Sequence, residues 1–278
     1  MSDSTTNRLA TTQTITDSAI RFDSVTIGFD EGDILKKISF SVQHRETLVL
    51  LGETGTGKTL LLKLAAGLLL PSSGNIEVLG KTLSTMTERE LLQFRRQVGF
   101  VFQEGALFDS LTVGENVAYR LLEDGATEDE VLPKVTEVLR FVELEHTVDQ
   151  LPSELSGGMR RRVSIARALI TQPPVVLYDS PTAGLDPVTA QTIITLILRL
   201  RDVFGVTALL ATHRVQDGFA LANFFFDPQT KRVHRDPSIK DAPAATRFLV
   251  LRHGRIYFEG TPQEFLDSKD SYLQRFLI

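Results

Sequence analysis

A glycine-rich segment of eight residues carries the clearest chemistry in this sequence. An apolar, β-type run (47–51) precedes it, and a leucine-rich helical run (60–66) follows it. The backbone N–H groups of such a loop and the start of the following helix together form an anion site. The segment therefore predicts a P-loop that binds the phosphates of a nucleotide. It fits G-x-x-x-x-G-K-[ST] with the residues Gly52, Glu53, Thr54, Gly55, Thr56, Gly57, Lys58 and Thr59.

Three polar side chains have expected roles at this loop. Lys58 supplies positive charge to the β- and γ-phosphates, and the Thr59 hydroxyl is a ligand for Mg²⁺. Asp179 ends a second apolar run (175–178), where a Walker B carboxylate holds Mg²⁺ directly or through water. On its own this aspartate is a weak signal, because strands often end in Asp at a turn.

A second anion site is predicted at Leu155 to Met159, which reads L-S-G-G-M and precedes a helical run (160–170). The Ser156 hydroxyl and the Gly157 and Gly158 amides would line that helix start. A chain with a P-loop does not need this site for its own nucleotide. Two copies packed head to tail would let each segment close over the nucleotide of the other.

Composition bounds the class of protein. The 278 residues are 42% hydrophobic, enough to bury a sizeable core, and the net charge of −5 disfavours a nucleic-acid partner. The absence of cysteine excludes disulfides and thiolate metal sites. Residues 1–18 are rich in Ser and Thr and predict a flexible tail, not a signal peptide. The longest apolar run is too short to cross a bilayer, so any membrane role needs a partner.

Apolar strands alternate with helices along the rest of the chain, which predicts a mostly parallel sheet covered on both faces. A more polar helical lobe is expected at about 104–160, in which Pro133 either kinks a helix or marks its start. The stretch 227–246 has three prolines and mixed charge; it predicts a solvated insertion loop, with a regulatory or partner-docking role as the alternative. The strands are expected at 20–22, 25–27, 38–42, 47–51, 98–102, 175–178, 207–212 and in a hairpin over 248–259, and the helices at 60–66, 87–96, 112–145, 160–170 and 187–204.

The ordered set of motifs resembles the nucleotide-binding subunit of an ABC transporter from about residue 20 onward. The set comprises the P-loop, Gln103, the segment 155–158, Asp179, Asp186 and His213. The resemblance implies an α/β, RecA-like P-loop NTPase fold, with an antiparallel β subdomain and a helical lobe, over residues 19–278. It also implies ATP and Mg²⁺ as ligands, a homodimer of ATPase subunits, and an integral-membrane permease. The chain would then be peripheral, on the cytoplasmic face of the inner membrane.

Further residue roles follow from the resemblance. Phe29 would stack on the adenine, Gln103 would couple the Mg²⁺ site to the helical lobe, and His213 would contact the γ-phosphate. Ala183 to Asp186 would form the loop that contacts the second subunit, and Leu60, where a second hydroxyl is common, would keep only its backbone N–H. Phe29, Gln103 and His213 each have an ordinary structural explanation when taken alone; the ordered set favours the site.

A narrower similarity is to the Mla/MCE lipid-transport ATPases. It rests on residues 103–118 and on 152–159, where Met159 replaces the more common Gln and basic residues follow. This similarity implies phospholipid transport with an MCE-domain substrate-binding protein. Residues 106–108 (Ala, Leu, Phe) fit either a groove for a permease helix or ordinary core packing. Three arginines, 160–162, predict a solvated helix face, with a dimer contact or a lipid-headgroup contact as the alternative.

Ser180 departs from the family pattern, which has Glu directly after the Walker B aspartate. Serine has no basic pKa near neutrality and cannot act as the general base, a loss of roughly 10²–10⁴ in rate. Three outcomes are open: slow hydrolysis with Ser180 orienting water, a base from elsewhere, or a site that mainly binds ATP. We expect slow hydrolysis in a lipid transporter. The alternatives are an ATP-binding regulator, an importer of another substrate, and a non-transport ABC ATPase, although the chain has neither tandem cassettes nor a long coiled coil.

Overall fold

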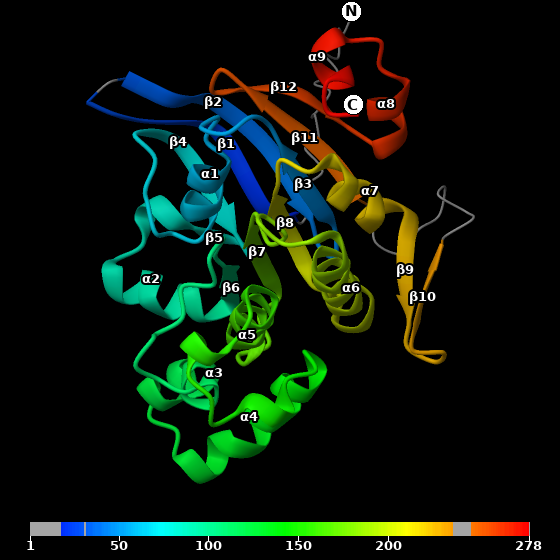
Figure 1. The fold of residues 1–278 in the computed structure, drawn as a ribbon. Coiled ribbons are helices and arrows are strands. Elements are labelled where there is room, and N and C mark those ends of the chain that lie inside the picture. Colours follow the sequence, from blue (N-terminus) through cyan, green and yellow to red (C-terminus); the bar gives the residue numbers. More distant parts are fainter. Residues whose placement is uncertain (1–17, 31, 236–245, 278) are drawn as a thin grey trace, which may run out of the picture.

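The computed structural model describes residues 18–30, 32–235 and 246–277. Its centre is a six-stranded sheet in the order β12-β11-β3-β8-β7-β6 (Figure 1). The five strands from β11 to β6 are parallel, and β12 pairs antiparallel to β11. The mostly parallel sheet is therefore confirmed. Its strands are β3 (Thr47–Leu51), β6 (Val98–Val101), β7 (Val175–Asp179), β8 (Thr207–Ala211), β11 (Thr246–Arg252) and β12 (Arg255–Gly260).

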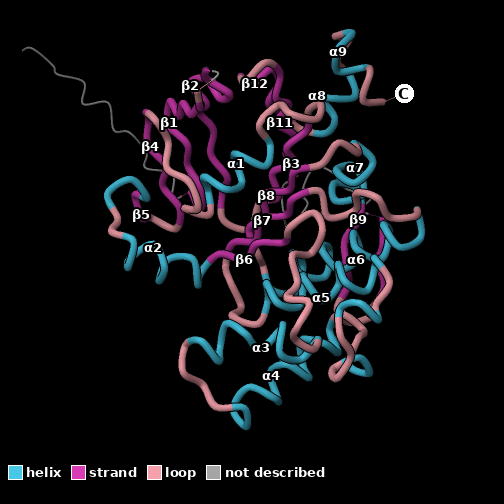
Figure 2. Tube along the Cα trace, turned by 60° about the vertical axis from the view of Figure 1, so that its left-hand side comes forward, coloured by secondary structure: helices cyan, strands magenta, loops and turns pink. Residues whose placement is uncertain are grey.

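A smaller antiparallel sheet, ordered β2-β1-β4-β5, covers one face of the central sheet (Figures 1 and 2). Phe22 stacks on Phe40 across β1 and β2, with ring centroids 4.6 Å apart. The sequence pattern identified β1 and β2 but not β4, which pairs with β1. The strands are β1 (Ser18–Phe29), β2 (Gly32–Gln43), β4 (Ser73–Val78) and β5 (Lys81–Thr82).

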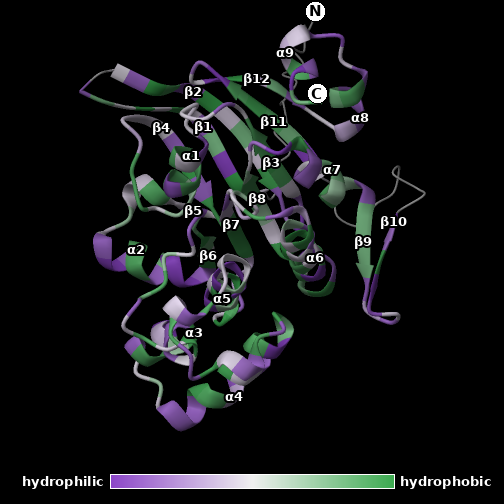
Figure 3. Ribbon diagram, in the orientation of Figure 1, coloured by the Kyte–Doolittle hydropathy of each residue, from purple (hydrophilic) through white to green (hydrophobic). Residues whose placement is uncertain are grey.

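Alternation along the central strands sends side chains into two separate cores. In β3, Leu48 and Leu50 join the core under the antiparallel sheet, whereas Val49 and Leu51 join the core under the large helices. Helix α1 (Lys58–Ala65) belongs to the first core. Helices α5 (Gly157–Leu169), α6 (Pro187–Phe204) and α7 (Val215–Asn223) belong to the second. Figure 3 shows the hydrophobic colour concentrated on these central strands.

The helical lobe extends away from the sheet at one end of the molecule (Figure 1). It contains α3 (Val113–Glu123) and α4 (Glu128–Phe141), both opened by capping boxes. Pro133 lies inside α4, so it does not mark the start of that helix. The remaining short helices are η1 (Leu83–Thr85), α2 (Glu88–Phe94), η2 (Arg95–Gln97), η3 (Glu145–Thr147), η4 (Pro152–Glu154), α8 (Pro262–Asp267) and α9 (Ser271–Gln274).

The expected insertion loop at 227–246 is partly wrong. Its first part belongs to a hairpin of β9 (Phe224–Asp227) and β10 (Arg232–Arg235), which lies beside α6 (Figure 1). Phe226 and Val233 pack against the core of the large helices, which explains why this segment is ordered into strands. Residues 236–245 and the tail 1–17 lie outside the described residues, and Ser18 belongs to β1. Across the described ranges, no helix has the length and apolar character that crossing a membrane requires.

Candidate functional site

The P-loop connects β3 to α1 and is closed by its own lysine. The Lys58 ammonium donates hydrogen bonds to the carbonyl oxygens of Gly52 (2.7 Å) and Glu53 (2.8 Å). Gly57, which caps α1, has φ +99°, and a Cβ there would approach Leu35 Cδ2 to 2.5 Å. Only glycine therefore fits this turn without strain. The loop presents the N-terminus of α1 towards a pocket, as an anion site requires.

The predicted metal ligands are neighbours in the structure. The Thr59 hydroxyl, from α1, donates to Asp179 Oδ1 at the end of β7 over 3.1 Å. Burial raises the pKa of Asp179, while the Thr59 hydrogen bond and the charges of Lys58 and Lys63 lower it. Burial also lowers the pKa of Lys58, and Asp179 opposes that shift. Two hard oxygens this close, beside a phosphate-binding loop, fit Mg²⁺, which commonly takes its other ligands from phosphates and water.

A pocket of about 420 Å³ lies over the loop and gathers most of the predicted site. Four predicted residues do not line the pocket, but each is adjacent to a lining residue in the chain or hydrogen-bonded to one: Gly52, Glu53, Thr56 and Asp179. Sequence reasoning missed Ile34 and Lys63; the second could have been found, because it lies one helical turn after Thr59. The pocket is lined by Phe29, Ile34, Thr54, Gly55, Gly57, Lys58, Thr59, Leu60, Lys63, Gln103, Ser180 and His213.

Ser180 occupies the pocket in a fixed and unusual conformation. Its φ is +48°, in the left-handed region that L-residues seldom adopt. Its N–H donates to the Ala211 carbonyl over 2.8 Å, and its own carbonyl accepts from the N–H of Ala183 over 3.1 Å. A hydrogen bond from Ser180 also lowers the pKa of Asp179, although burial, the largest influence, raises it. The serine is thus held by its backbone beside Asp179, the predicted metal ligand.

The second predicted anion site lies elsewhere on the chain. Ser156 caps α5, and its hydroxyl accepts a hydrogen bond from the Met159 N–H. Asp186 caps α6, and its Oδ1 accepts from the N–H groups of Val188 and Thr189, both over 3.0 Å. Ser156, Gly157, Gly158 and Asp186 do not line the P-loop pocket. Their contact with the nucleotide of a second copy therefore stays a prediction.

The solvated-face interpretation of the three arginines is wrong for Arg161. This side chain is buried, and its guanidinium donates to the Phe102 carbonyl over 3.0 Å. Arg162 is half-buried and donates to the Val142 carbonyl over 3.0 Å, while Arg160 is exposed. Burial lowers the pKa of Arg161, which the charges of Glu104 and Asp179 oppose. The carbonyls that accept these bonds follow β6 and α4, where the regular backbone pattern ends.

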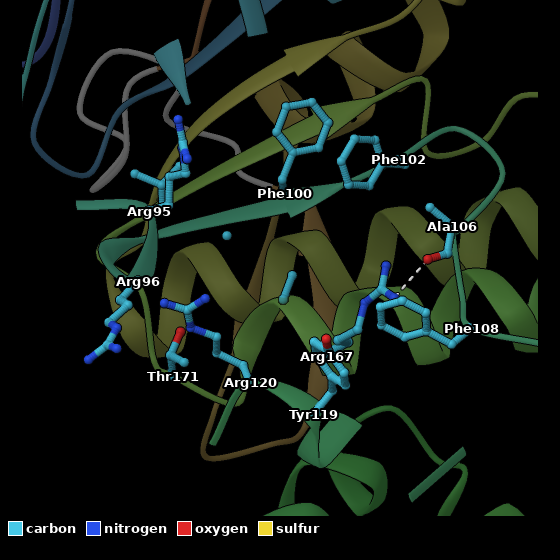
Figure 4. Close-up of a pocket in the computed structure, with 13 residues that line it drawn as sticks. Arg95, Arg96, Phe100, Phe102, Ala106, Phe108, Tyr119, Arg120, Arg167 and Thr171 are labelled. Atoms are coloured by element: carbon cyan, nitrogen blue, oxygen red, sulfur yellow. Dashed lines mark hydrogen bonds between the residues drawn. The ribbon is translucent and has the colours of Figure 1, made fainter. Parts of the chain in front are cut away.

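A second concavity, of about 350 Å³, lies beside the segment that follows Gln103 (Figure 4). We call it the arginine groove. Ala106 and Phe108 line it and are exposed, whereas Leu107 packs on the core, so the apolar patch expected at 106–108 is divided between surface and interior. Its lining combines aromatic rings with four guanidinium-bearing residues: Phe100, Phe102, Phe108, Tyr119, Arg95, Arg96, Arg120 and Arg167.

Comparisons with known proteins identify the family. The sequence profile of the ABC transporter family matches residues 35–183. Protein TRIGALACTOSYLDIACYLGLYCEROL 3 of Arabidopsis thaliana is 36% identical over 260 residues, 89% of this chain and 70% of that protein. The methionine import ATP-binding protein MetN 1 of Staphylococcus aureus (strain N315) is 38% identical over 246 residues, 88% of this chain; the chain spans 65% of its length.

Two solved structures share the fold. A dimeric, post-hydrolysis ATP-binding cassette, MJ0796, bound to ADP and Pi, aligns with a TM-score of 0.73 and 27% identity over 87% of this chain and 98% of its own. The cbiO1 protein of Clostridium perfringens, part of the ABC transporter complex cbiONQ, aligns with a TM-score of 0.75 and 26% identity over 94% and 95%. The profile match, the relatives that align over most of the chain and the P-loop geometry all agree. This chain belongs to the ABC transporter family, as an ATP-binding ATPase subunit.

Proposed function

We propose that this chain hydrolyses ATP with Mg²⁺ to power transport of a lipid across or between membranes. The ATPase part of the proposal rests on the convergence of several predicted site residues on one pocket, whose lining residue Thr59 is hydrogen-bonded to Asp179. The converging residues are Lys58, Gln103, Ser180 and His213. In this arrangement Lys58 compensates phosphate charge and His213 contacts the γ-phosphate. Phe29, exposed at the rim, stacks on the base.

Ser180 sets the expected speed of hydrolysis. Its hydroxyl cannot accept a proton as a carboxylate does, but its fixed backbone can hold the hydroxyl against a water molecule. Phosphoryl transfer depends mainly on positioning and charge neutralisation, and the residues for both surround the pocket. Slow hydrolysis, with the serine orienting water, is therefore the proposed outcome.

A second copy of the chain completes the site in this proposal. Ser156, Gly157 and Gly158 open α5 as an anion site away from their own pocket. The cassette MJ0796, 27% identical, is a dimer. ATP would hold two copies together, with the helical lobe of about 104–160 moving with α5, and hydrolysis would release them.

The arginine groove is the proposed contact with a membrane permease. Its lining includes Phe102, which directly precedes Gln103 in the chain, so a docked helix could sense the state of the nucleotide. Phe108 is 42% exposed and tilts against Tyr119, with ring centroids 4.6 Å apart, giving an apolar seat. The surrounding guanidinium groups favour an occupant with carboxylates next to an apolar side chain. The chain would then work on the cytoplasmic face of the inner membrane, as cbiO1 works within a transporter complex.

The proposal of a lipid substrate rests on the local similarity to the Mla/MCE ATPases at residues 103–118 and at Met159. The same similarity implies an MCE-domain partner. The Arabidopsis relative bears the name of a galactolipid, which supports the proposal. The Staphylococcus relative is named for methionine import, and this makes an amino-acid importer the second candidate.

The test is ATPase activity of the protein co-purified with its permease, for wild type, Ser180→Glu and Lys58→Ala. Turnover by wild type well above Lys58→Ala supports a working motor. Equal rates for these two, with turnover only in Ser180→Glu, would show a nucleotide-binding switch and sink the hydrolytic proposal. Stimulation of the same complex in proteoliposomes by phospholipid, and not by added methionine, supports the lipid over the amino acid.

A further inference from the structure

A buried carboxylate lies behind the pocket and has no part in the site described above. Asp217, in the first turn of α7, is only 3% exposed. It faces the two loops that follow β7 and β8, which carry Ser180 and His213 into the pocket. A carboxylate removed from water is costly unless its oxygens are paired, so its partners indicate what holds it there.

Both loops supply those partners through a threonine. Asp217 Oδ2 accepts a short hydrogen bond from the Thr182 hydroxyl and a second one, of 3.0 Å, from the Thr212 hydroxyl. Thr182 is two residues after Ser180, Thr212 is directly before His213, and both threonines are buried. One oxygen atom therefore joins the two loops that hold the groups nearest the expected γ-phosphate.

Arg214 completes the arrangement. Its Nε lies 3.6 Å from Asp217 Oδ1, and its backbone N–H donates to the Thr212 hydroxyl oxygen over 3.0 Å. Asp217 and Arg214 thus both contact Thr212 in the loop that carries His213, and Asp217 alone connects that loop to Thr182. One backbone bond, from the Ser180 N–H to the Ala211 carbonyl, links the start of this loop to the end of β8, and farther along the loop the Thr182 side chain links it to Asp217.

We infer that Asp217 is a positioning residue for ATP hydrolysis, one that fixes Ser180 and His213 relative to each other through Thr182 and Thr212. The inference rests on the proposed hydrolysis. A serine that only orients water depends on its placement, and a misplacement of about 1 Å can cost roughly 10² in rate. Binding of ATP depends mainly on the P-loop and Phe29, so Asp217 should affect turnover and leave binding intact.

The experiment compares Asp217→Ala and Asp217→Asn in the permease complex. Asp202→Asn is the matched control, since Asp202 is also a buried carboxylate paired with an arginine, Arg201, but lies outside the pocket. We expect Asp217→Ala to lower kcat, measured as the hydrolysis rate per bound ATP, by a factor of roughly 10² while the affinity for ATP stays unchanged. Asp217→Asn keeps an acceptor oxygen and should recover most of the rate. Asp202→Asn should lower only the melting temperature.

Amide hydrogen exchange separates this inference from the proposed function. In Asp217→Ala, exchange should quicken together at Ser180 and Thr212, whose N–H groups are both bonded in the structure. Unchanged exchange at both, or kcat and ATP affinity falling in parallel, would overturn the positioning role. If the wild-type protein does not hydrolyse ATP, the hydrolytic proposal fails. The positioning role of Asp217 is then tested by amide hydrogen exchange at Ser180 and Thr212, and by the effect of Asp217→Ala on kcat in the Ser180→Glu background.

Discussion

The Arg167 guanidinium holds an unusual turn beside Gln103, and its removal gives a measurable prediction. Its two terminal nitrogens donate to the carbonyls of Ala106 (2.7 Å) and Gly105 (2.8 Å). Those two residues are consecutive in the left-handed region, with φ +48° and +82°. Burial lowers the pKa of Arg167, yet arginine stays charged in proteins. We predict that Arg167→Met loosens this turn while the rest of the fold stays intact.

The expected size follows from the contacts. Each hydrogen bond from a charged donor contributes roughly 1.5–3 kcal/mol, so the pair contributes about 3–6 kcal/mol. Relaxation of Ala106 out of the left-handed region returns about 1–2 kcal/mol. A net loss of about 1–5 kcal/mol in local stability remains. At 1.4 kcal/mol per tenfold, the open state of the segment becomes roughly 5 to 4,000 times more populated.

Hydrogen exchange of two amides reports this opening. The Gly105 N–H donates to the Phe102 carbonyl over 3.0 Å, and the Phe108 N–H donates to the Asn116 side-chain oxygen over 2.8 Å. In Arg167→Met, both amides should exchange faster by the same factor as the increase in the open-state population. The increase should be smaller in Arg167→Lys, which keeps the positive charge but loses the pair of guanidinium donors. Arg160→Met is the control, because that exposed arginine bonds within its own helix start. Unchanged exchange at both amides in Arg167→Met would refute the reasoning.

Four further predictions concern separate parts of the molecule. Phe29→Ala should weaken ATP binding roughly 5- to 150-fold, the equivalent of about 1–3 kcal/mol of base stacking, in a fluorescent-nucleotide titration; equal affinity would exclude stacking. Asp186→Ala should lower the melting temperature and Asp186→Asn much less, because the amide can still cap α6; equal losses would argue against the cap. Gly158→Ala places a Cβ 2.3 Å from Thr189 Cγ2 and should cost about 1–3 kcal/mol of stability in denaturant unfolding. Thr189→Ser should restore it, and no restoration would place the cost elsewhere. Phe108→Ser should reduce co-purification of the permease without lowering the melting temperature; undiminished recovery would exclude the arginine groove as the docking site.

The parts of the fold that the sequence predicts well are those specified by local pattern. The strand over 47–51 and the helix from Pro187 to Phe204 have the expected bounds, because a short apolar run between turn signals, or a cap at Asp186 and a left-handed Gly205, acts locally. β4 was missed, since Gly74 and Asn75 have low strand propensity and the strand depends on pairing with β1.

The same division applies to the site. The P-loop is contiguous, so spacing alone predicts it, and the structure brings Gln103 and His213 to the same pocket. Ile34 was missed because β2 reaches the pocket only through packing of the antiparallel sheet. Arg161 was misjudged because three consecutive arginines on a helix point in three directions. Only the position of Phe102 decides which of them is buried.

Helix α5 connects the predicted anion site for a second copy's nucleotide to the segment around Gln103 in the chain's own pocket. Its first residues form the anion site that would meet the nucleotide of a second copy, while Arg161 and Arg167 farther along hold the carbonyls of Phe102, Gly105 and Ala106. Those carbonyls flank Gln103, which lines the chain's own pocket. Because charged hydrogen bonds tie helix and segment together, a shift of α5 must either carry the backbone around Gln103 with it or break bonds worth several kcal/mol. In the proposed dimer, closure over one nucleotide would therefore alter the surroundings of the other, and the arginine groove between these elements would change shape in the same step.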